Sequence, residues 1–141
     1  MIKQLLKYID FDDEVKEETL YFNLTAAELA DIEVELGESL KEFIERIVQK
    51  DDDGNTFVKK ENNGKVLNLF KMIISKAYGE RTPEGRFVKT DDIRNSFLAT
   101  EAYSQLFLRL ITDPEECRKF ISELAKVKVY TPEDHKQVTN A

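Results

Sequence analysis

The stretch LYFNLTAAEL, residues 20–29, decides the fold, because the spacing of its apolar residues changes there from that of a strand to that of a helix. Up to Leu24 apolar and polar positions alternate, as they do on a strand with one buried face. From Thr25 the sequence Thr25-Ala26-Ala27-Glu28 is a capping box, in which the threonine oxygen accepts from the amide of Glu28 and the glutamate reaches back. The stretch predicts a strand that leads directly into a helix.

Toward the N-terminus, residues 3–11 and 15–24 both have the composition of strands. The short polar segment 12–14 between them has the length of a hairpin connection. We therefore predict an antiparallel β-hairpin over residues 1–24. Its register stays open, because the first run carries apolar residues on both faces.

Toward the C-terminus, residues 25–50 are expected to form two amphipathic helices. In the first, Leu29, Ile32 and Leu36 have helical spacing and precede Gly37, a residue suited to the left-handed conformation that ends many helices. Ser39 then has the position of a helix N-cap, and the second apolar stripe runs from residue 40 to residue 48.

The segment 51–64 is expected to be a loop, since it has three consecutive aspartates, two Asn/Gly pairs and only two apolar side chains to bury. Residues 65–126 have helical periodicity again, in a long helix that Gly79 should end and in shorter helices after a turn region over residues 80–89. The expected N-caps of these shorter helices are Thr90 or Asp91, Thr100, and Asp113 before Pro114.

The predicted fold is therefore mainly α, with about five to six helices and an N-terminal antiparallel β-hairpin, in a single α+β domain of residues 1–126. Residues 127–141 have no sustained period, and we expect them to form a flexible tail.

Composition limits the kinds of partner. With 21 Lys plus Arg against 28 Asp plus Glu, the net charge is −7, which repels phosphate backbones, so we expect no binding to nucleic acid. No apolar run is long enough to span a bilayer, and the start is not signal-like. We expect no membrane association and a cytoplasmic location.

The sequence predicts no catalytic, metal-binding or cofactor-binding residues. The one histidine, His135, lies in the expected tail, and Cys117 lies on an apolar helical stripe where a small core residue is expected. The glycines match neither phosphate-binding pattern. The acidic run 51–54 fails as a calcium loop, because Gln49 and Lys60 would stand at its first and last ligand positions. We therefore expect a protein that is not an enzyme.

Three segments lie between about residue 15 and residue 125: Tyr21-Phe22-Asn23-Leu24-Thr25 with Glu28-Leu29; Tyr78-Gly79-Glu80 with Gly85-Arg86-Phe87-Val88-Lys89; and Phe97, Thr100-Glu101-Ala102-Tyr103-Ser104 with Leu106-Phe107. In this order and at this spacing they resemble the phage tail assembly chaperone family of long-tailed phages that infect Gram-positive hosts. The resemblance implies a cytoplasmic protein, absent from the finished virion, that binds the long, helix-rich tape measure protein and helps recruit tail tube protein. It implies no catalysis.

An apolar helical partner would aggregate unless another surface covered it, and an acidic protein favours a partner with basic faces. Coverage by many copies also predicts self-association. Tyr21 and Tyr103 are the candidate partner-binding residues, Tyr21 because the alternation of its strand points it outward. The alternative is an acidic decoy that occupies a host nucleic-acid-binding protein, but this would need a one-sided acidic stripe, and here Lys and Arg are interspersed with the acids.

Overall fold

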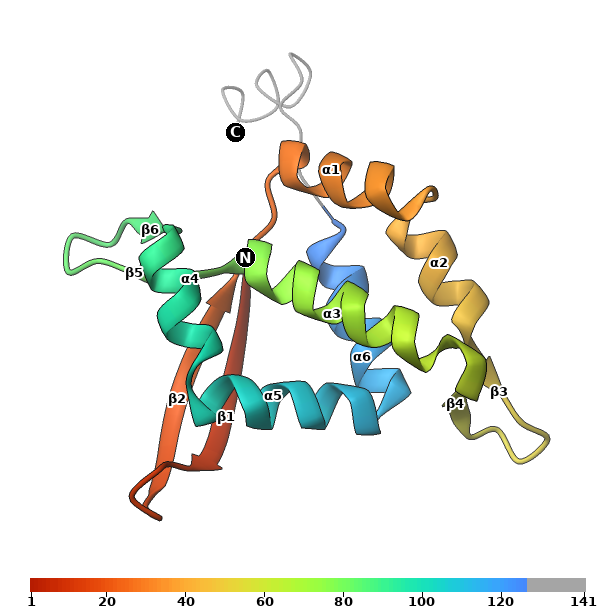
Figure 1. The fold of residues 1–141 in the computed structure, drawn as a ribbon, viewed down its shortest axis with the longest axis horizontal. Helices are drawn as coiled ribbons and strands as arrows, with labels where there is room; N and C mark the ends of the chain where they lie inside the picture. The colour runs from red at the N-terminus through yellow and green to blue at the C-terminus, as the bar shows by residue number, and fades with distance from the viewer. Residues whose placement is uncertain (127–141) are drawn as a thin grey trace, which may run out of the picture.

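The computed structural model describes residues 1–126, which form six α-helices and an N-terminal antiparallel β-hairpin in one small α+β domain (Figure 1). The predicted fold class is confirmed. The predicted tail, 127–141, lies outside the described residues. The helices are α1 (Ala26–Leu36), α2 (Leu40–Ile47), α3 (Asn63–Ala77), α4 (Asp91–Leu98), α5 (Glu101–Thr112) and α6 (Pro114–Leu124), with a 3-10 turn at Lys60–Asn62 before α3.

The hairpin consists of β1 (Ile2–Ile9) and β2 (Val15–Phe22), which pair along their whole length from Ile2 opposite Phe22 to Ile9 opposite Val15. A short strand, β5 (Tyr78–Arg81), joins β2 only at Tyr21 and Phe22, and β6 (Phe87–Val88) pairs with β5. The strand order is β1-β2-β5-β6. Within the described residues, 15–20 of β2 therefore pair with β1 alone, and the hairpin continues past the small sheet as a two-stranded ribbon (Figure 1).

Every helix start except that of α3, and the end of α1, follows the caps that the sequence predicts. Thr25 and Glu28 form both hydrogen bonds of the capping box, and α1 ends at Gly37 with φ at +84°. Side-chain oxygens of Ser39, Thr90 and Thr100 accept from backbone amides at the starts of α2, α4 and α5. These predictions are confirmed because each cap satisfies amides that the first helical turn leaves without a partner.

Two regions differ from the sequence prediction. The segment 51–64 is not wholly a loop. It contains β4 (Thr56–Val58), which pairs with β3 (Val48–Lys50) in a second hairpin, and α3 already begins at Asn63. The long helix does not run to Gly79 but ends at Ala77, and the turn region 80–89 contains a strand pair. In both places the backbone finds hydrogen-bond partners on a neighbouring strand, which periodicity along one segment cannot show.

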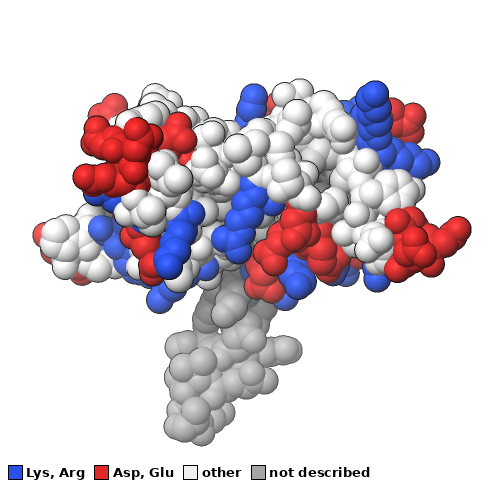
Figure 2. All heavy atoms as spheres, turned by 90° about the horizontal axis from the view of Figure 1, so that it is seen from below, with Lys and Arg blue, Asp and Glu red and all other residues white. Residues whose placement is uncertain are grey.

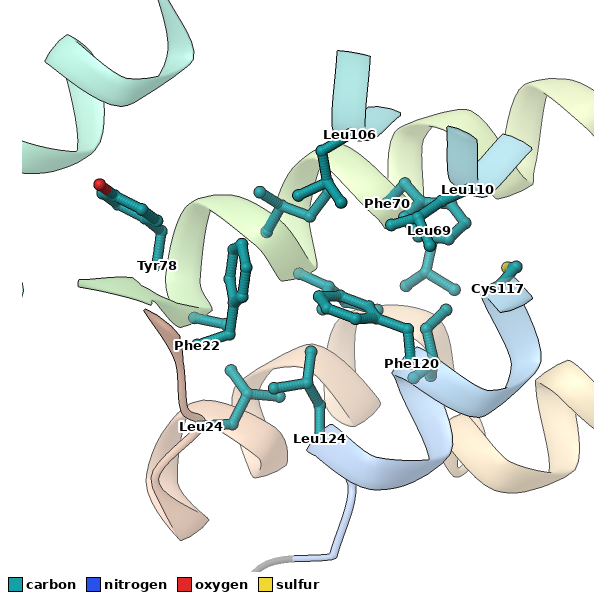
Figure 3. Close-up of a cluster of buried hydrophobic side chains, with 14 of the residues drawn as sticks. Phe22, Leu24, Leu69, Phe70, Tyr78, Leu106, Leu110, Cys117, Phe120 and Leu124 are labelled. Atoms are coloured by element: carbon teal, nitrogen blue, oxygen red, sulfur yellow. The ribbon is translucent and has the colours of Figure 1, made fainter. Parts of the chain in front are cut away.

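The core lies between the inner face of the hairpin and the helices, and among the described residues no polar or charged side chain is buried. Figure 3 shows Phe22 from β2 beside Phe120 from α6, with ring centroids 5.2 Å apart in an edge-to-face arrangement. Cys117 belongs to this core, as predicted, and burial, with the nearby Asp113 carboxylate, raises its thiol pKa to about 12.

Candidate partner-binding surface

The two faces of the β1–β2 hairpin differ in burial. Leu6 and Leu20 point inward and are buried, and α5 packs against β1. On the outer face Leu5, Ile9 and Val15 keep 57%, 55% and 73% of their surface exposed. Ile9 lies directly opposite Val15 in the strand pairing, so these two side chains form an apolar pair beside the turn. Leu5 is separated from them on the same face by the Lys7–Glu17 ion pair.

The turn that joins the strands is held by Asp10. One carboxylate oxygen of Asp10 accepts from the backbone amides of Asp12 and Glu14, each at 2.9 Å. The backbone hydrogen bond from Glu14 is the main reason why the pKa of Asp10 lies below its ordinary value. Held in this way, the turn presents Phe11 to solvent with 74% of its surface exposed, two residues beyond Ile9 of the apolar pair.

Charges at the turn are mainly negative. Lys16 lies within 3.7 Å of Asp10 and 3.5 Å of Glu14, whereas Asp12 and Asp13 form no ion pair within residues 1–126. Figure 2 shows acidic side chains gathered at the left end of the molecule, the end at which this turn lies in Figure 1. The outer face and turn of the hairpin therefore combine exposed apolar side chains with a negative end.

Tyr21 and Tyr103 occupy different environments. Tyr21 is half-buried on the outer face of β2, with the guanidinium carbon of Arg81 5.8 Å from its ring centroid. Tyr103 is half-buried in α5, edge-to-face with Phe97 at 5.7 Å, and burial raises its pKa. The strand alternation places Tyr21 on the opposite side of the sheet from Phe22, which contacts Phe97, so the two tyrosines do not share a surface. Their binding role stays a prediction.

Sequence reasoning missed Leu5, Ile9, Phe11 and Val15. Apolar residues on both faces of the first strand were the available signal, since a strand that packs on one side only needs only one apolar face.

The three segments of the family resemblance meet at one place in the fold. Tyr78 pairs with Phe22 across the strands, and its ring stacks on that of Phe97 with centroids 3.7 Å apart and planes 6° apart. Gly79 lies so close to Phe87 that an added Cβ would be 2.5 Å from its ring. The ammonium of Lys89 is bonded to the carboxylate of Glu28. We call this place the junction, and its residues are mainly buried, so they determine structure rather than offer a binding surface.

A groove of about 450 Å³ lies between α1, α2 and α6. Leu29 and Ala125 provide apolar walls, and both acidic and basic side chains, including Glu33, Lys41 and Arg118, line the remainder. Because its charges are mixed, the groove indicates no particular class of ligand.

Residues 1–126 contain neither a metal site nor a membrane-spanning helix. No group of three or more His, Cys, Asp or Glu side chains in this range is placed to hold a metal ion. None of the helices described there combines the length and the hydropathy needed to cross a membrane.

A family model described as phage tail assembly chaperone matches residues 1–130. No curated protein and no solved structure matches the chain significantly. The family match covers nearly the whole chain, including the three segments that form the junction, and it confirms the resemblance noted in the sequence. This chain therefore belongs to the phage tail assembly chaperone family.

Proposed function

We propose that this protein binds the tape measure protein in the cytoplasm of the host, keeps it soluble, and helps recruit tail tube protein during tail morphogenesis without joining the finished virion. The family supports a chaperone role in tail assembly. The specific partners are our proposal, and we propose no catalytic step and no cofactor.

The observation that carries the proposal is where the exposed apolar surface lies. Five of the eight large apolar side chains that are exposed among the described residues belong to the first fifteen residues: Met1, Leu5, Ile9, Phe11 and Val15. Scattered apolar residues are normal on a protein surface, but Ile9, Phe11 and Val15 gather at the turn of one hairpin, and a grouped exposed apolar surface indicates a contact with another polypeptide. A long apolar helical protein would aggregate before assembly unless another polypeptide bound its apolar surface.

The net charge of the chain and the binding of several copies to one partner both support the tape measure protein as that partner. The net charge of −7 keeps a complex soluble and favours segments that carry Lys and Arg beside their apolar stripe. Several copies along one long polypeptide need only modest affinity each, so we propose self-association through weak interfaces. Basic side chains lie among acidic ones on the face shown in Figure 2, an arrangement unlike the one-sided stripe that a nucleic-acid decoy needs.

Co-expression with the tape measure protein of the same phage tests the proposal. Overlapping tape measure fragments, each expressed with and without this chain, should move from the insoluble to the soluble fraction when the chain is present, and should purify with it through a tag on the fragment. Fragments that stay insoluble, or that become soluble without retaining the chain, would contradict the proposed function.

A further inference from the structure

Three hairpin turns in the described residues share one backbone arrangement. In each, the carbonyl of the first residue accepts from the amide of the fourth, and the amide of the first residue donates to the carbonyl of the fifth. The side-chain oxygen of the first residue accepts from the amide of the fifth. The fourth residue has a positive φ, of 61° at Asp13, 83° at Gly54 and 86° at Gly85. The turns are residues 10–14, 51–55 and 82–86.

The second position of this turn imposes no apolar requirement. It is occupied by Phe11 in the first turn, by Asp52 in the second and by Pro83 in the third. Phe11 keeps 74% of its surface in water, so it contributes little to the core. Neither the turn geometry nor the packing of residues 1–126 explains a phenylalanine there.

The neighbours of Phe11 make the turn end of the ribbon apolar. Ile9 and Val15 flank the turn as an opposed pair on the outer face, and the next outer-face pair is the Lys7–Glu17 ion pair, so the apolar surface is confined to the turn end. Because the Asp10 carboxylate holds two amides of the turn, the Phe11 backbone is ordered before any partner arrives, which lowers the entropy lost on binding.

Charge indicates which partner fits. The turn itself carries Asp10, Asp12, Asp13 and Glu14, and of the basic residues within 1–126 only Lys16 is paired with any of them. An exposed aromatic ring among carboxylates suits an apolar pocket with a basic rim, because such a rim gains an opposite charge while the ring leaves water.

We propose that Phe11 is the anchor through which this protein binds its partner. The Phe11 ring inserts into an apolar groove on a helical segment of the partner, and Lys and Arg side chains flank that groove. The inference rests on the proposed function, because the segment belongs to the tape measure protein. Ile9 and Val15 complete the apolar contact, and Asp12 and Asp13 contact the basic rim.

The test measures the affinity of the full-length chain for a tape measure fragment that it retains in co-expression. Phe11→Ser should weaken binding about tenfold or more, as expected for a central aromatic anchor. The matched control is Val34→Ser, which removes a side chain that is 82% exposed on α1 and should change the affinity by less than about twofold. Urea unfolding of each variant checks that the fold is unchanged.

A second pair of variants tests the charge. Asp12→Lys should weaken binding to the same fragment and reduce its dependence on salt, whereas Asp53→Lys, at the equivalent third position of the β3–β4 turn, should leave both unchanged. Equal losses from both variants would mean that only net charge matters, and would overturn the assignment of the basic rim to this turn.

The outcomes separate this inference from the proposed function. If the unmodified chain binds a fragment and Phe11→Ser binds it as tightly, the anchor is wrong while the function stands. If Phe11→Ser disrupts self-association in sedimentation experiments and leaves fragment binding intact, the surface belongs to a second copy and the inference is overturned. If the unmodified chain binds no fragment, both the function and the anchor are wrong.

Discussion

Replacing Lys89 by methionine tests whether one partly buried cation joins three segments of the fold. The Lys89 Nζ donates to the carbonyl of Asn23 at 2.9 Å and to that of Lys76 at 3.0 Å, and it pairs with the Glu28 carboxylate. Asn23 follows β2, Lys76 lies in the last turn of α3, and Lys89 follows β6. Methionine keeps the aliphatic stem and removes all three bonds.

The expected loss in the free energy of unfolding depends on how far the Lys89–Glu28 ion pair is exposed to water. Breaking a buried ion pair on one side costs about 3–5 kcal/mol, and losing an exposed pair costs less than about 1 kcal/mol. The side chains of Lys89 and Glu28 are 14% and 23% exposed, so some screening applies. We therefore expect Lys89→Met to lower the free energy of unfolding by about 2 kcal/mol.

Urea unfolding followed by circular dichroism measures this loss. The matched control is Lys126→Met, because Lys126 and Glu123 form an ion pair with side chains 70% and 57% exposed, and its loss should cost less than about 0.5 kcal/mol. A Lys89→Met penalty no larger than that of the control would refute the reasoning.

The penalty should also depend on pH. Burial opposes ionisation of Glu28, but the hydrogen bond from Lys89 and the one from the Thr25 amide outweigh it, so the pKa of Glu28 lies below its ordinary value of 4.5. A carboxyl with a lowered pKa stabilises the folded state above its unfolded pKa, and this contribution is lost as the pH falls through the folded value. The Lys89→Met penalty should therefore shrink below pH 4.5, and an equal penalty at about pH 7 and about pH 3 would contradict the role of Glu28.

Three more predictions concern the turns, the junction and the core. Asp13 and Gly85 both have a positive φ, which glycine adopts without strain. In urea titrations Asp13→Gly should therefore raise the free energy of unfolding by about 0.5 kcal/mol, and Gly85→Ala should lower it by about 1 kcal/mol. Changes of the same sign would exclude backbone strain as the cause. Gly79→Ala should lower the thermal midpoint, with a loss of about 1–3 kcal/mol, because its methyl group would collide with the Phe87 ring; an unchanged midpoint would show that the ring moves aside freely. The Cys117 thiol should react with a thiol reagent at neutral pH only as fast as the protein opens, since it is buried and its pKa is raised to about 12; a rate that does not slow when the fold is stabilised would show an accessible thiol.

Features that depend on neighbouring residues in the chain were predictable from the sequence. A capping box satisfies its amides within four residues, so Thr25 and Glu28 fix the start of α1 wherever the helix later packs. The position of Cys117 on an apolar stripe likewise indicated a core residue, because helical spacing alone decides which side chains share a face.

Features that depend on segments distant in the chain could not be predicted from the sequence. Tyr78 and Gly79 leave α3 for a strand because β2 offers them hydrogen bonds, and β2 lies more than fifty residues earlier in the chain. The sequence likewise showed apolar residues on both faces of the first strand without showing which face would be covered.

By itself, then, the sequence determined the α+β class, the starts of the helices other than α3, the N-terminal hairpin and the family, since each depends on short-range spacing or on motif order. Only the tertiary structure decided that the helices cover the inner face of the hairpin and leave Leu5, Ile9, Phe11 and Val15 in water. The physical reason is that burial depends on how separate segments pack. When both faces of a strand carry apolar residues, the strand alone does not show which face another element will cover.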